Sequence, residues 1–342
     1  MKYIGNKTRI MDFIEESLIK ENIDYNRKKV IDLFAGTGSV SSFFLKYGST
    51  VYSCDNMLYS ICEQYRINYY QEEPTFEELK NYIIDYSLEG VLNHLNSLPL
   101  LKDYFYENYA PSGKYKRMYF SDINAMKIDA IRIEIKKWEE ILPKEKNLFL
   151  LGILMCAADK VSNTSGTYGA YLKIWRSMAL KDLTLEKPIF TSKGKNIIEL
   201  CDVLSCVKKH KDVDIIYMDP PYNKRQYASN FHVLENIVVF DKQELKGKTG
   251  LRNYEDQKSD YCVKNKVKNT FEELVMNMTT KYLVMSYSTE GLLSEEDILD
   301  VLHKRGVVSV YRYTYRRFKT NAWTDNNTNL QELLFICKFA NS

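Results

Sequence analysis

Short apolar runs of strand length alternate along the chain with patterns of helical spacing. The runs predict strands at residues 30–33, 51–55, 188–191, 214–218, 281–287, 306–315 and 332–338. The helical patterns predict helices over residues 10–18, after the first strand through Phe43, and over 148–158. This alternation of strands and helices predicts an α/β fold in which helices cover both faces of one sheet.

The alternation breaks between about residues 71 and 146. A helical patch there is followed by tyrosines interleaved with cations, among them Lys114, Lys116 and Arg117. Aromatic rings stack on nucleobases while Lys and Arg bind phosphates, so we interpret residues 71–146 as an inserted target-recognition region. Because the chain contains 27 tyrosines, the alternative is a hairpin whose rings only pack inside the protein. Residues 1–70 and 147–342 then form the main domain.

The most specific pattern is Asp219-Pro220-Pro221-Tyr222, which follows the strand predicted at 214–218. Proline cannot donate to a strand ladder, so the strand stops and Asp219 lies at its carboxyl end, where open α/β sheets bind ligands. The Asp219 carboxylate and the Pro220 carbonyl can accept both hydrogens of one amino group, and Tyr222 offers a face for a planar heterocycle. The alternative is a simple stop signal after a strand.

A glycine turn follows the first predicted strand, with Phe34 before Gly36 and Gly38. These glycines let the backbone approach a ligand closely, but Ser41 stands where a dinucleotide-binding fingerprint needs its third glycine. Asp55 ends the next strand about 20 residues on, the distance at which such folds bind ribose hydroxyls. Asp55 can instead cap the helix that follows.

These motifs resemble those of known methyltransferases. Residues 219–222 are similar to the signature of enzymes that methylate exocyclic amino groups, above all the N6-adenine-specific DNA methyltransferases. Residues 32–38 resemble the S-adenosylmethionine motif of class I methyltransferases, and residues 3–7 resemble the N-terminal motif of the Dam-like (D12, α-group) class. Residues 159–173 resemble a segment of the FokI-like type II modification methylases. The resemblance covers nearly the whole chain except the insert.

The resemblance implies a class I S-adenosylmethionine-dependent methyltransferase fold, a Rossmann-like, doubly wound and mostly parallel sheet with an antiparallel final hairpin. It implies site-specific transfer of a methyl group from S-adenosylmethionine to adenine N6 in double-stranded DNA, after the base has flipped out of the helix. Catalysis is then expected of Asp219, Pro220 and Tyr222. Cofactor contacts are expected at Tyr3, Lys7, Phe34, Gly36, Gly38, Asp55, Asn196 and Asp219. Relatives commonly carry an acid at the position of Asn196, so Asp202 is the alternative there.

Basic and aromatic residues outside the cofactor motifs are candidate DNA contacts. They are Lys114, Lys116, Arg117, Tyr168, Lys173, Lys224, Arg225, Tyr227, Lys248 and Arg316. A helix-surface His232 beside them is interpreted as structural or DNA-contacting rather than as a general base. The Gly-Lys-Thr at 247–249 lacks the first glycine of a phosphate-binding loop, so nucleotide hydrolysis is rejected.

Composition narrows the class of protein. The net charge of +3 is nearly neutral, so DNA contact depends on local basic patches. Seven cysteines without a Cys-x-x-Cys pair, and four histidines, indicate neither a disulfide framework nor a metal site. We expect no membrane span, a cytoplasmic location, and a cognate restriction endonuclease as a functional but not a physical partner.

Four other functions fit parts of this pattern. A cytosine-N4 methyltransferase uses the same chemistry but usually carries Ser at the position of Asp219. An RNA adenine methyltransferase also fits, whereas a protein-glutamine methyltransferase would carry Asn there. A non-enzymatic DNA-binding relic would have lost one of the motifs, and all of them are present in the chain.

Overall fold

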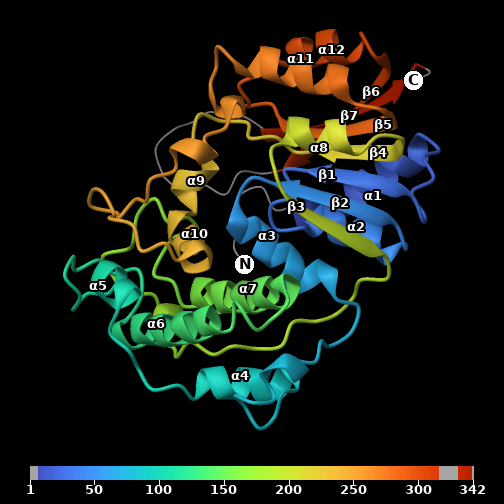
Figure 1. Ribbon diagram of the computed structural model, residues 1–342. Coiled ribbons are helices and arrows are strands. Elements are labelled where there is room, and N and C mark those ends of the chain that lie inside the picture. Colours follow the sequence, from blue (N-terminus) through green and yellow to red (C-terminus); the bar gives the residue numbers. More distant parts are fainter. Residues whose placement is uncertain (1–6, 316–329, 341–342) are drawn as a thin grey trace.

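A computed structural model describes residues 7–315 and 330–340 of the protein. Seven strands form a single sheet in the order β3-β2-β1-β4-β5-β7-β6 (Figure 1). The strands are β1 (Lys29–Leu33), β2 (Thr50–Asp55), β3 (Lys195–Leu200), β4 (Val213–Met218), β5 (Thr280–Ser288), β6 (Gly306–Tyr315) and β7 (Leu330–Phe339). Strands β1 to β5 are parallel, and β7 runs antiparallel between β5 and β6. The predicted fold class and the antiparallel final hairpin are confirmed.

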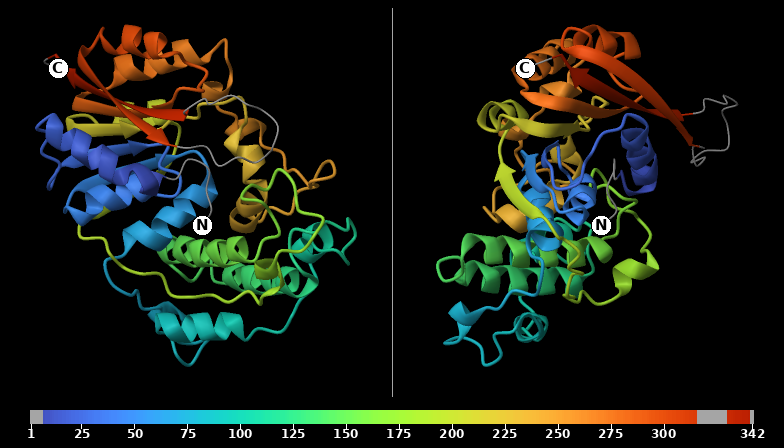
Figure 2. Two further views of the ribbon diagram at one scale, coloured as in Figure 1. Left: turned by 180° about the vertical axis from the view of Figure 1, so that it is seen from behind. Right: turned by 90° about the vertical axis from the view of Figure 1, so that its right-hand side faces the viewer.

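Helices cover both faces of the sheet (Figure 2) because successive strand residues point to opposite sides. Ile215 and Val30 pack with Phe44 of α2 (Ser39–Lys46) and with α1 (Met11–Lys20). Their neighbours Ile216 and Ile31 pack on the other face. The helices on that face are α8 (Val203–Lys209), α11 (Val267–Asn277) and α12 (Glu295–Leu302).

A helical lobe lies beside the sheet at the carboxyl end of β2 (Figure 1). It comprises α3 (Leu58–Gln64), α4 (Leu88–Asn96), α5 (Tyr104–Tyr109), α6 (Asp122–Lys137), α7 (Lys144–Lys160) and α10 (His232–Val239). These helices share one apolar core around Trp138, Phe105 and Phe149. The predicted boundary at residue 146 falls inside α7, which packs against both α3 and α6. The division of recognition from catalysis at that residue stays a prediction.

One predicted strand is wrong. Residues 188–191 form no strand, because Phe190 packs against Phe149 of α7 in the helical lobe, and β3 begins only at Lys195. The tyrosine-rich segment forms α5 and the irregular chain that follows it, and Tyr104, Tyr109 and neighbouring aromatic rings fill the apolar core of the lobe. The alternative interpretation, that these tyrosines pack, holds for all of them except the exposed Tyr115.

Two helices follow the central motif. A short α9 (Tyr227–Asn230) is followed by α10, which begins at His232. Lys224 and Arg225 precede both helices in an exposed loop. His232 is fully buried with its Nε2 2.9 Å from the Tyr168 carbonyl oxygen, so its structural interpretation is confirmed. Within the described ranges, no helix is long and apolar enough to cross a bilayer.

Candidate active site

A cavity of about 320 Å³ opens at the carboxyl ends of β1, β2 and β4. Strand order reverses here, since β1 lies between β2 and β4, and crevices at such reversals are where open α/β sheets bind ligands. Lys7, Phe34, Gly36, Asp55 and Asp219 all line this one cavity. The structure therefore brings together motifs that lie more than 200 residues apart in sequence.

The turn after β1 is held in a left-handed conformation at three positions. The φ angle is +59° at Phe34, +50° at Gly36 and +73° at Gly38. The Asp55 carboxylate fixes this turn, because its Oδ2 accepts from the Gly36 amide at 2.9 Å and its Oδ1 from the Met57 amide at 2.9 Å. Burial outweighs these hydrogen bonds and raises the pKa of Asp55 to about 6. Asp55 thus organises the backbone of the turn as well as lining the cavity.

Gly38 is a position where a side chain is excluded on two grounds. Its φ of +73° strains any other residue, and an added Cβ would lie 2.6 Å from the Asn68 amide and 2.7 Å from the Gln64 amide. Both of these side chains are buried and bond the turn itself. We expect Gly38→Ala to lower the free energy of unfolding by about 1–3 kcal/mol and to weaken binding of S-adenosylhomocysteine.

Gly247→Ala is the matched control, because Gly247 has a φ of +70° but no atom within 4 Å of its added Cβ. Gly247→Ala should lower the free energy of unfolding through backbone strain but leave the affinity for S-adenosylhomocysteine unchanged. Calorimetric titration and thermal unfolding of both variants measure the two effects. Equal ligand affinity in Gly38→Ala and Gly247→Ala would contradict the assignment of the turn to the ligand site.

Lys7 forms ion pairs with both Asp219 and Glu332. Lys7 Nζ lies 2.9 Å from Asp219 Oδ1 and 2.6 Å from Glu332 Oε1, and all three side chains are less than 20% exposed. Glu332 projects from β7 and also accepts a hydrogen bond from the Ser286 hydroxyl of β5. One cation between two carboxylates leaves this cluster with a net negative charge. We call Lys7, Asp219 and Glu332 the charged triad.

The triad sets the ionisation of Asp219. Burial raises the pKa of Asp219 to about 6, Lys7 acts against this rise, and Glu332 adds to it. Burial disfavours the Lys7 ammonium, but attraction to the two carboxylates raises the pKa of Lys7 well above its ordinary value. At neutral pH the Asp219 carboxylate is therefore ionised, next to a permanently charged ammonium. Such a group is a strong hydrogen-bond acceptor.

The other residues of the Asp-Pro-Pro-Tyr motif differ in whether they reach the cavity. Pro221 lines the cavity and Pro220 is buried beside it. Tyr222 is half-buried and packs against the apolar core shared by β5, α11 and α12, while its carbonyl accepts from the Leu292 amide. The structure does not bring the Tyr222 ring into the cavity lining. Its stacking role stays a proposal, as does hydrogen bonding to the Pro220 carbonyl.

The predicted cofactor contact at Asn196 is wrong. Asn196 is buried beneath the sheet edge, where its Oδ1 accepts from the Ser53 hydroxyl at 2.7 Å, and it does not line the cavity. The alternative, Asp202, does line the cavity. It also caps α8, because its side chain accepts from the Ser205 amide at 3.0 Å. Asn196 lies near the start of β3, and its side chain contacts Ser53 of β2. Asp202 lies after the carboxyl end of β3, where the cavity opens.

Sequence reasoning missed two parts of the site. The first is Glu332, for which the signal was the one acid in the predominantly apolar strand β7. The second is a wall formed by residues 257–261, in which Tyr261 packs edge-on against Phe34 with ring centroids 5.0 Å apart. Leu204 adds an apolar surface to the same cavity. The wall belongs to a loop without periodicity, so no pattern in the sequence points to it.

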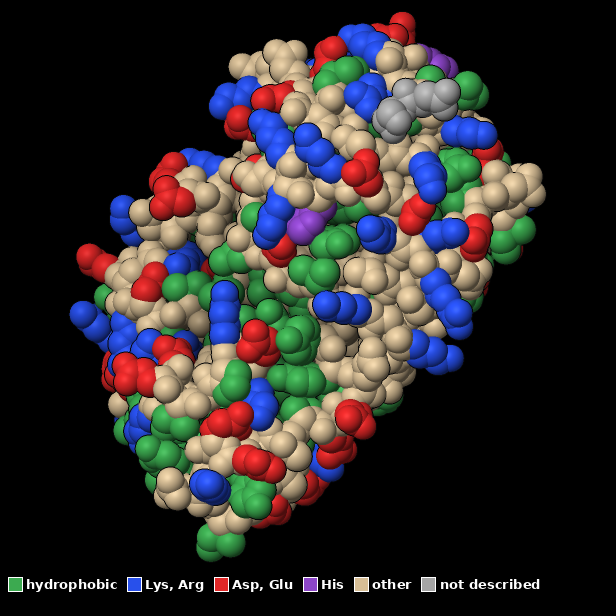
Figure 3. All heavy atoms as spheres, turned by 45° about the vertical axis from the view of Figure 1, so that its right-hand side comes forward, with side chains coloured by type: hydrophobic (Ala, Val, Ile, Leu, Met, Phe, Trp, Pro, Cys, Tyr) green, Lys and Arg blue, Asp and Glu red, His purple; other side chains and the backbone are tan. Residues whose placement is uncertain are grey.

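Six of the candidate DNA contacts are exposed on the surface: Lys114, Lys116, Lys173, Lys224, Arg225 and Lys248. Figure 3 shows a hollow with apolar side chains inside it and, around it, Lys and Arg side chains together with some Asp and Glu. Tyr227 was expected among the DNA contacts, but in the structure it lines the cavity that contains Asp219. Tyr3 and Arg316 lie outside the described residues.

Arg117 is not available to DNA in this structure. It is 3% exposed, and its guanidinium donates to the carbonyls of Asn108, Gly247 and Lys248. It also stacks on Tyr115 at 4.5 Å from the ring centroid. Its predicted DNA contact is therefore wrong. Arg117 instead fastens the exposed loop around Lys248 to the helical lobe.

Tyr168 is likewise buried, with no exposed area, and its hydroxyl donates to Asp159 Oδ1 at 2.8 Å. The predicted DNA contact at Tyr168 is wrong because its ring belongs to the core of the lobe. We expect Tyr168→Phe to cost about 1 kcal/mol of stability and to leave DNA affinity unchanged. Lys173 is exposed, in contrast to Tyr168, and is therefore free to contact DNA.

Lys173→Ala should weaken DNA binding and reduce the slope of log affinity against log salt concentration by about one.

Fluorescence-anisotropy titrations of a labelled duplex at several salt concentrations separate these two variants. A loss of DNA affinity in Tyr168→Phe with an unchanged melting temperature would contradict the structural role. An unchanged affinity and salt slope in Lys173→Ala would remove Lys173 from the DNA-binding surface.

Comparison with known proteins identifies the family. Residues 3–301 match the model of the D12 class N6 adenine-specific DNA methyltransferases. The chain is 39% identical over 328 residues to type II methyltransferase M.FokI of Planomicrobium okeanokoites, covering 94% of this chain and 50% of that protein. It is 33% identical over 344 residues to modification methylase StsI of Streptococcus sanguinis, covering 98% of this chain and 51% of that protein.

A third relative matches along its whole length. Type II methyltransferase M.NlaIII of Neisseria lactamica is 35% identical over 338 residues, covering 96% of this chain and 95% of that protein. The chain thus spans about half the length of the first two relatives and nearly all of the third. On the match over residues 3–301 and these identities, the chain belongs to the D12 class of N6 adenine-specific DNA methyltransferases.

Proposed function

We propose that this protein transfers a methyl group from S-adenosylmethionine to N6 of a specific adenine in double-stranded DNA. The observation that carries this proposal is the position of Asp219. Asp219 lies at the carboxyl end of β4, in the same cavity as the glycine turn that follows β1. The ammonium of Lys7 pairs with the Asp219 carboxylate and favours the charged form. The cavity therefore combines a cradle for a nucleoside-like ligand with an acceptor for an amino group.

The residues of the cavity fit S-adenosylmethionine. The left-handed turn at Gly36 presents backbone without a side chain, and Asp55 and Asp202 supply carboxylate oxygens for hydroxyl and amino groups. Phe34, Leu204 and Tyr261 supply apolar surface for an adenine ring. When bound, this ligand provides a methyl group already activated by the positive charge of a sulfonium.

Asp219 acts on the nucleophile. The lone pair of adenine N6 is delocalised into the ring, so the nitrogen attacks poorly unless its geometry changes. In our proposal the Asp219 carboxylate and the Pro220 carbonyl accept the two N6 hydrogens and hold the nitrogen with its lone pair toward the methyl group. A bound sulfonium donor would supply the methyl group, and the proton that N6 gives up on methylation would pass to the Asp219 carboxylate that already accepts its hydrogen bond.

The target base must leave the duplex to reach this cavity, because adenine N6 is otherwise enclosed in the stack. The apolar hollow and its surrounding cations in Figure 3 support such a mode of binding. Lys224 and Arg225, exposed directly after the Asp-Pro-Pro-Tyr motif, are placed to hold phosphates beside an extruded base. Lys114, Lys116, Lys173 and Lys248 are further exposed cations that we propose as phosphate contacts.

A role in a restriction-modification system is part of the proposal and rests on the printed names of the relatives, two of which are type II methyltransferases. A restriction endonuclease that cleaves the same sequence is then the functional partner. The location that this proposal implies is the cytoplasm.

The product of the reaction tests the proposal. Purified protein is incubated with S-adenosylmethionine and a mixture of duplex DNA sequences, and the digested nucleosides are separated by mass spectrometry. We expect N6-methyladenine and no N4-methylcytosine, with no modification of an RNA duplex of the same sequences. N4-methylcytosine, methylated RNA, or no methylated nucleoside from a diverse duplex pool would contradict it.

A further inference from the structure

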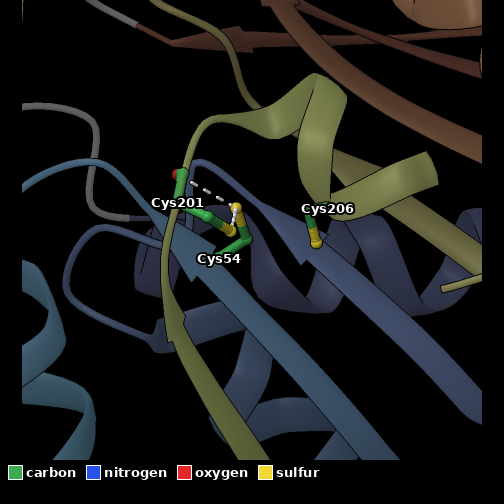
Figure 4. Close-up of side chains that lie close together, drawn as sticks. All are labelled: Cys54, Cys201 and Cys206. Carbon is green, nitrogen blue, oxygen red and sulfur yellow. Dashed lines mark hydrogen bonds between the residues drawn. The ribbon is translucent and has the colours of Figure 1, made fainter. Parts of the chain in front are cut away.

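Three cysteines from three elements lie close together (Figure 4), and one of them, Cys201, lines the cavity. Cys54 lies near the end of β2, Cys201 directly follows β3, and Cys206 lies in α8. Their sulfur atoms are all within 4.8 Å of one another, and those of Cys54 and Cys201 are 3.2 Å apart. Figure 4 shows the Cys54 and Cys201 side chains pointing toward each other. The proposed methyl transfer uses none of them.

The three thiols differ in access. Cys54 and Cys206 are buried, whereas Cys201 is half-buried and lines the cavity. A small oxidant that enters the cavity therefore meets Cys201 first. Hydrogen bonds from the Cys206 and Cys54 thiols also lower the pKa of Cys201, while the pKa of Cys54 is raised. Cys201 is thus the member of the cluster with both access and thiolate character, the two properties that make a cysteine reactive.

We propose that Cys201 and Cys54 form a reversible oxidation site, which hydrogen peroxide converts into a disulfide bond. The Cys201 thiolate attacks one peroxide oxygen, the O–O bond breaks, and Cys201 becomes a sulfenic acid. The hydroxide that leaves takes up the proton that the Cys201 thiol gave up and becomes water. The Cys54 sulfur then attacks the sulfenic sulfur and forms the S–S bond. The hydroxide released takes up the Cys54 proton, so that two thiols are oxidised and one peroxide is reduced to two waters.

The backbone already holds this pair in place. The amide of Cys201 donates to the carbonyl of Asp55 at 3.0 Å, which extends the pairing of β2 with β3 to the residues beside both cysteines. The sulfurs at 3.2 Å are closer than two thiolates on one tetrahedral zinc ion, which are about 3.8 Å apart for Zn–S bonds of about 2.3 Å. The geometry therefore favours a disulfide over a metal ion.

Peptide mapping tests the site directly. The reduced, full-length protein is treated with hydrogen peroxide, its remaining thiols are alkylated, and its peptides are analysed by mass spectrometry. We expect one cross-linked pair containing Cys54 and Cys201, lower in mass by two hydrogens and restored by dithiothreitol. Cys201→Ser should abolish it. Cys156→Ser, which alters a half-buried thiol of α7 outside the cluster, should retain it.

Three results would overturn the proposal. One is oxidation of Cys201 to a sulfinic acid without a cross-link. Another is a cluster in which all three cysteines remain alkylatable while Cys156 is oxidised. Binding of zinc that blocks alkylation of all three thiols in the untreated protein would also count against a disulfide site.

A second arm tests the position of Cys201 on the cavity wall, and it rests on the proposed function. Saturating S-adenosylhomocysteine should slow the cross-link, because a bound ligand shields the thiol from the oxidant. Calorimetry measures the binding of this ligand separately. A cross-link in a protein that does not bind the ligand would contradict the proposed function alone. Binding without a slower cross-link would contradict access through the cavity.

Discussion

Replacing Asp219 by alanine should lower the rate of DNA methylation by about a thousandfold or more while DNA and S-adenosylhomocysteine still bind. The reason is that the carboxylate interacts with N6 as the new bond forms, and loss of one preorganised group of this kind costs about two to three orders of magnitude. A larger loss is expected here because the nitrogen has almost no reactivity of its own. Single-turnover kinetics with excess enzyme measures the methyl-transfer step.

Asp219→Asn is the matched variant. It keeps one acceptor oxygen in the same place but removes the charge, so its activity should lie between those of the wild type and Asp219→Ala. Neither variant should unfold the protein, because burial raises the pKa of Asp219 to about 6 and so makes its charge unfavourable for folding. Methylation at more than one-tenth of the wild-type rate in Asp219→Ala would contradict the catalytic role.

Replacing Lys7 by methionine should have the second largest effect. Without the ammonium, two partly buried carboxylates face each other, and a lone buried charge of this kind costs about 3–5 kcal/mol of stability. Lys7 lowers the pKa of Asp219, so its loss should raise that pKa above about 6. More Asp219 is then protonated at neutral pH, and the carboxylate that accepts the N6 hydrogen is lost.

The pH dependence of kcat/KM shows this shift with a definite sign. In the wild type the rate should fall as the pH drops through about 6, where Asp219 takes up a proton. Lys7→Met should move this fall to higher pH. Glu332→Gln should move it to lower pH, because the Glu332 charge raises the pKa of Asp219. Shifts of the two variants in the same direction would contradict the charged triad.

The sheet and its central motif could be predicted because local sequence determines them. Apolar runs ended by prolines or glycines predict where β1, β2 and β4 stop, and parallel strands place those ends at one edge. Asp219 and Gly36 were therefore expected to lie together, and the structure places both in one cavity. The predicted family and fold class are confirmed, whereas the roles of individual site residues stay predictions.

Other features depend on tertiary packing and left little trace in the sequence. Lys7 and Glu332 are 325 residues apart, and their contact forms only when β7 inserts beside β5. Arg117 and Tyr168 are residue types that commonly contact DNA, but contacts with distant segments of the chain bury both side chains. The choice between Asn196 and Asp202 depended on the exact end of β3, the kind of boundary that patterns locate within a few residues only.

The central claim is that the methyl donor and the target amine meet at Asp219. A crystal structure with S-adenosylhomocysteine and a duplex containing the methylated sequence tests it most directly. We predict the ligand against Gly36 and Asp55 with its sulfur toward Asp219, and an extruded adenine whose N6 lies within hydrogen-bond distance of that carboxylate. A ligand bound outside this cavity, or an adenine held away from Asp219, would contradict the account.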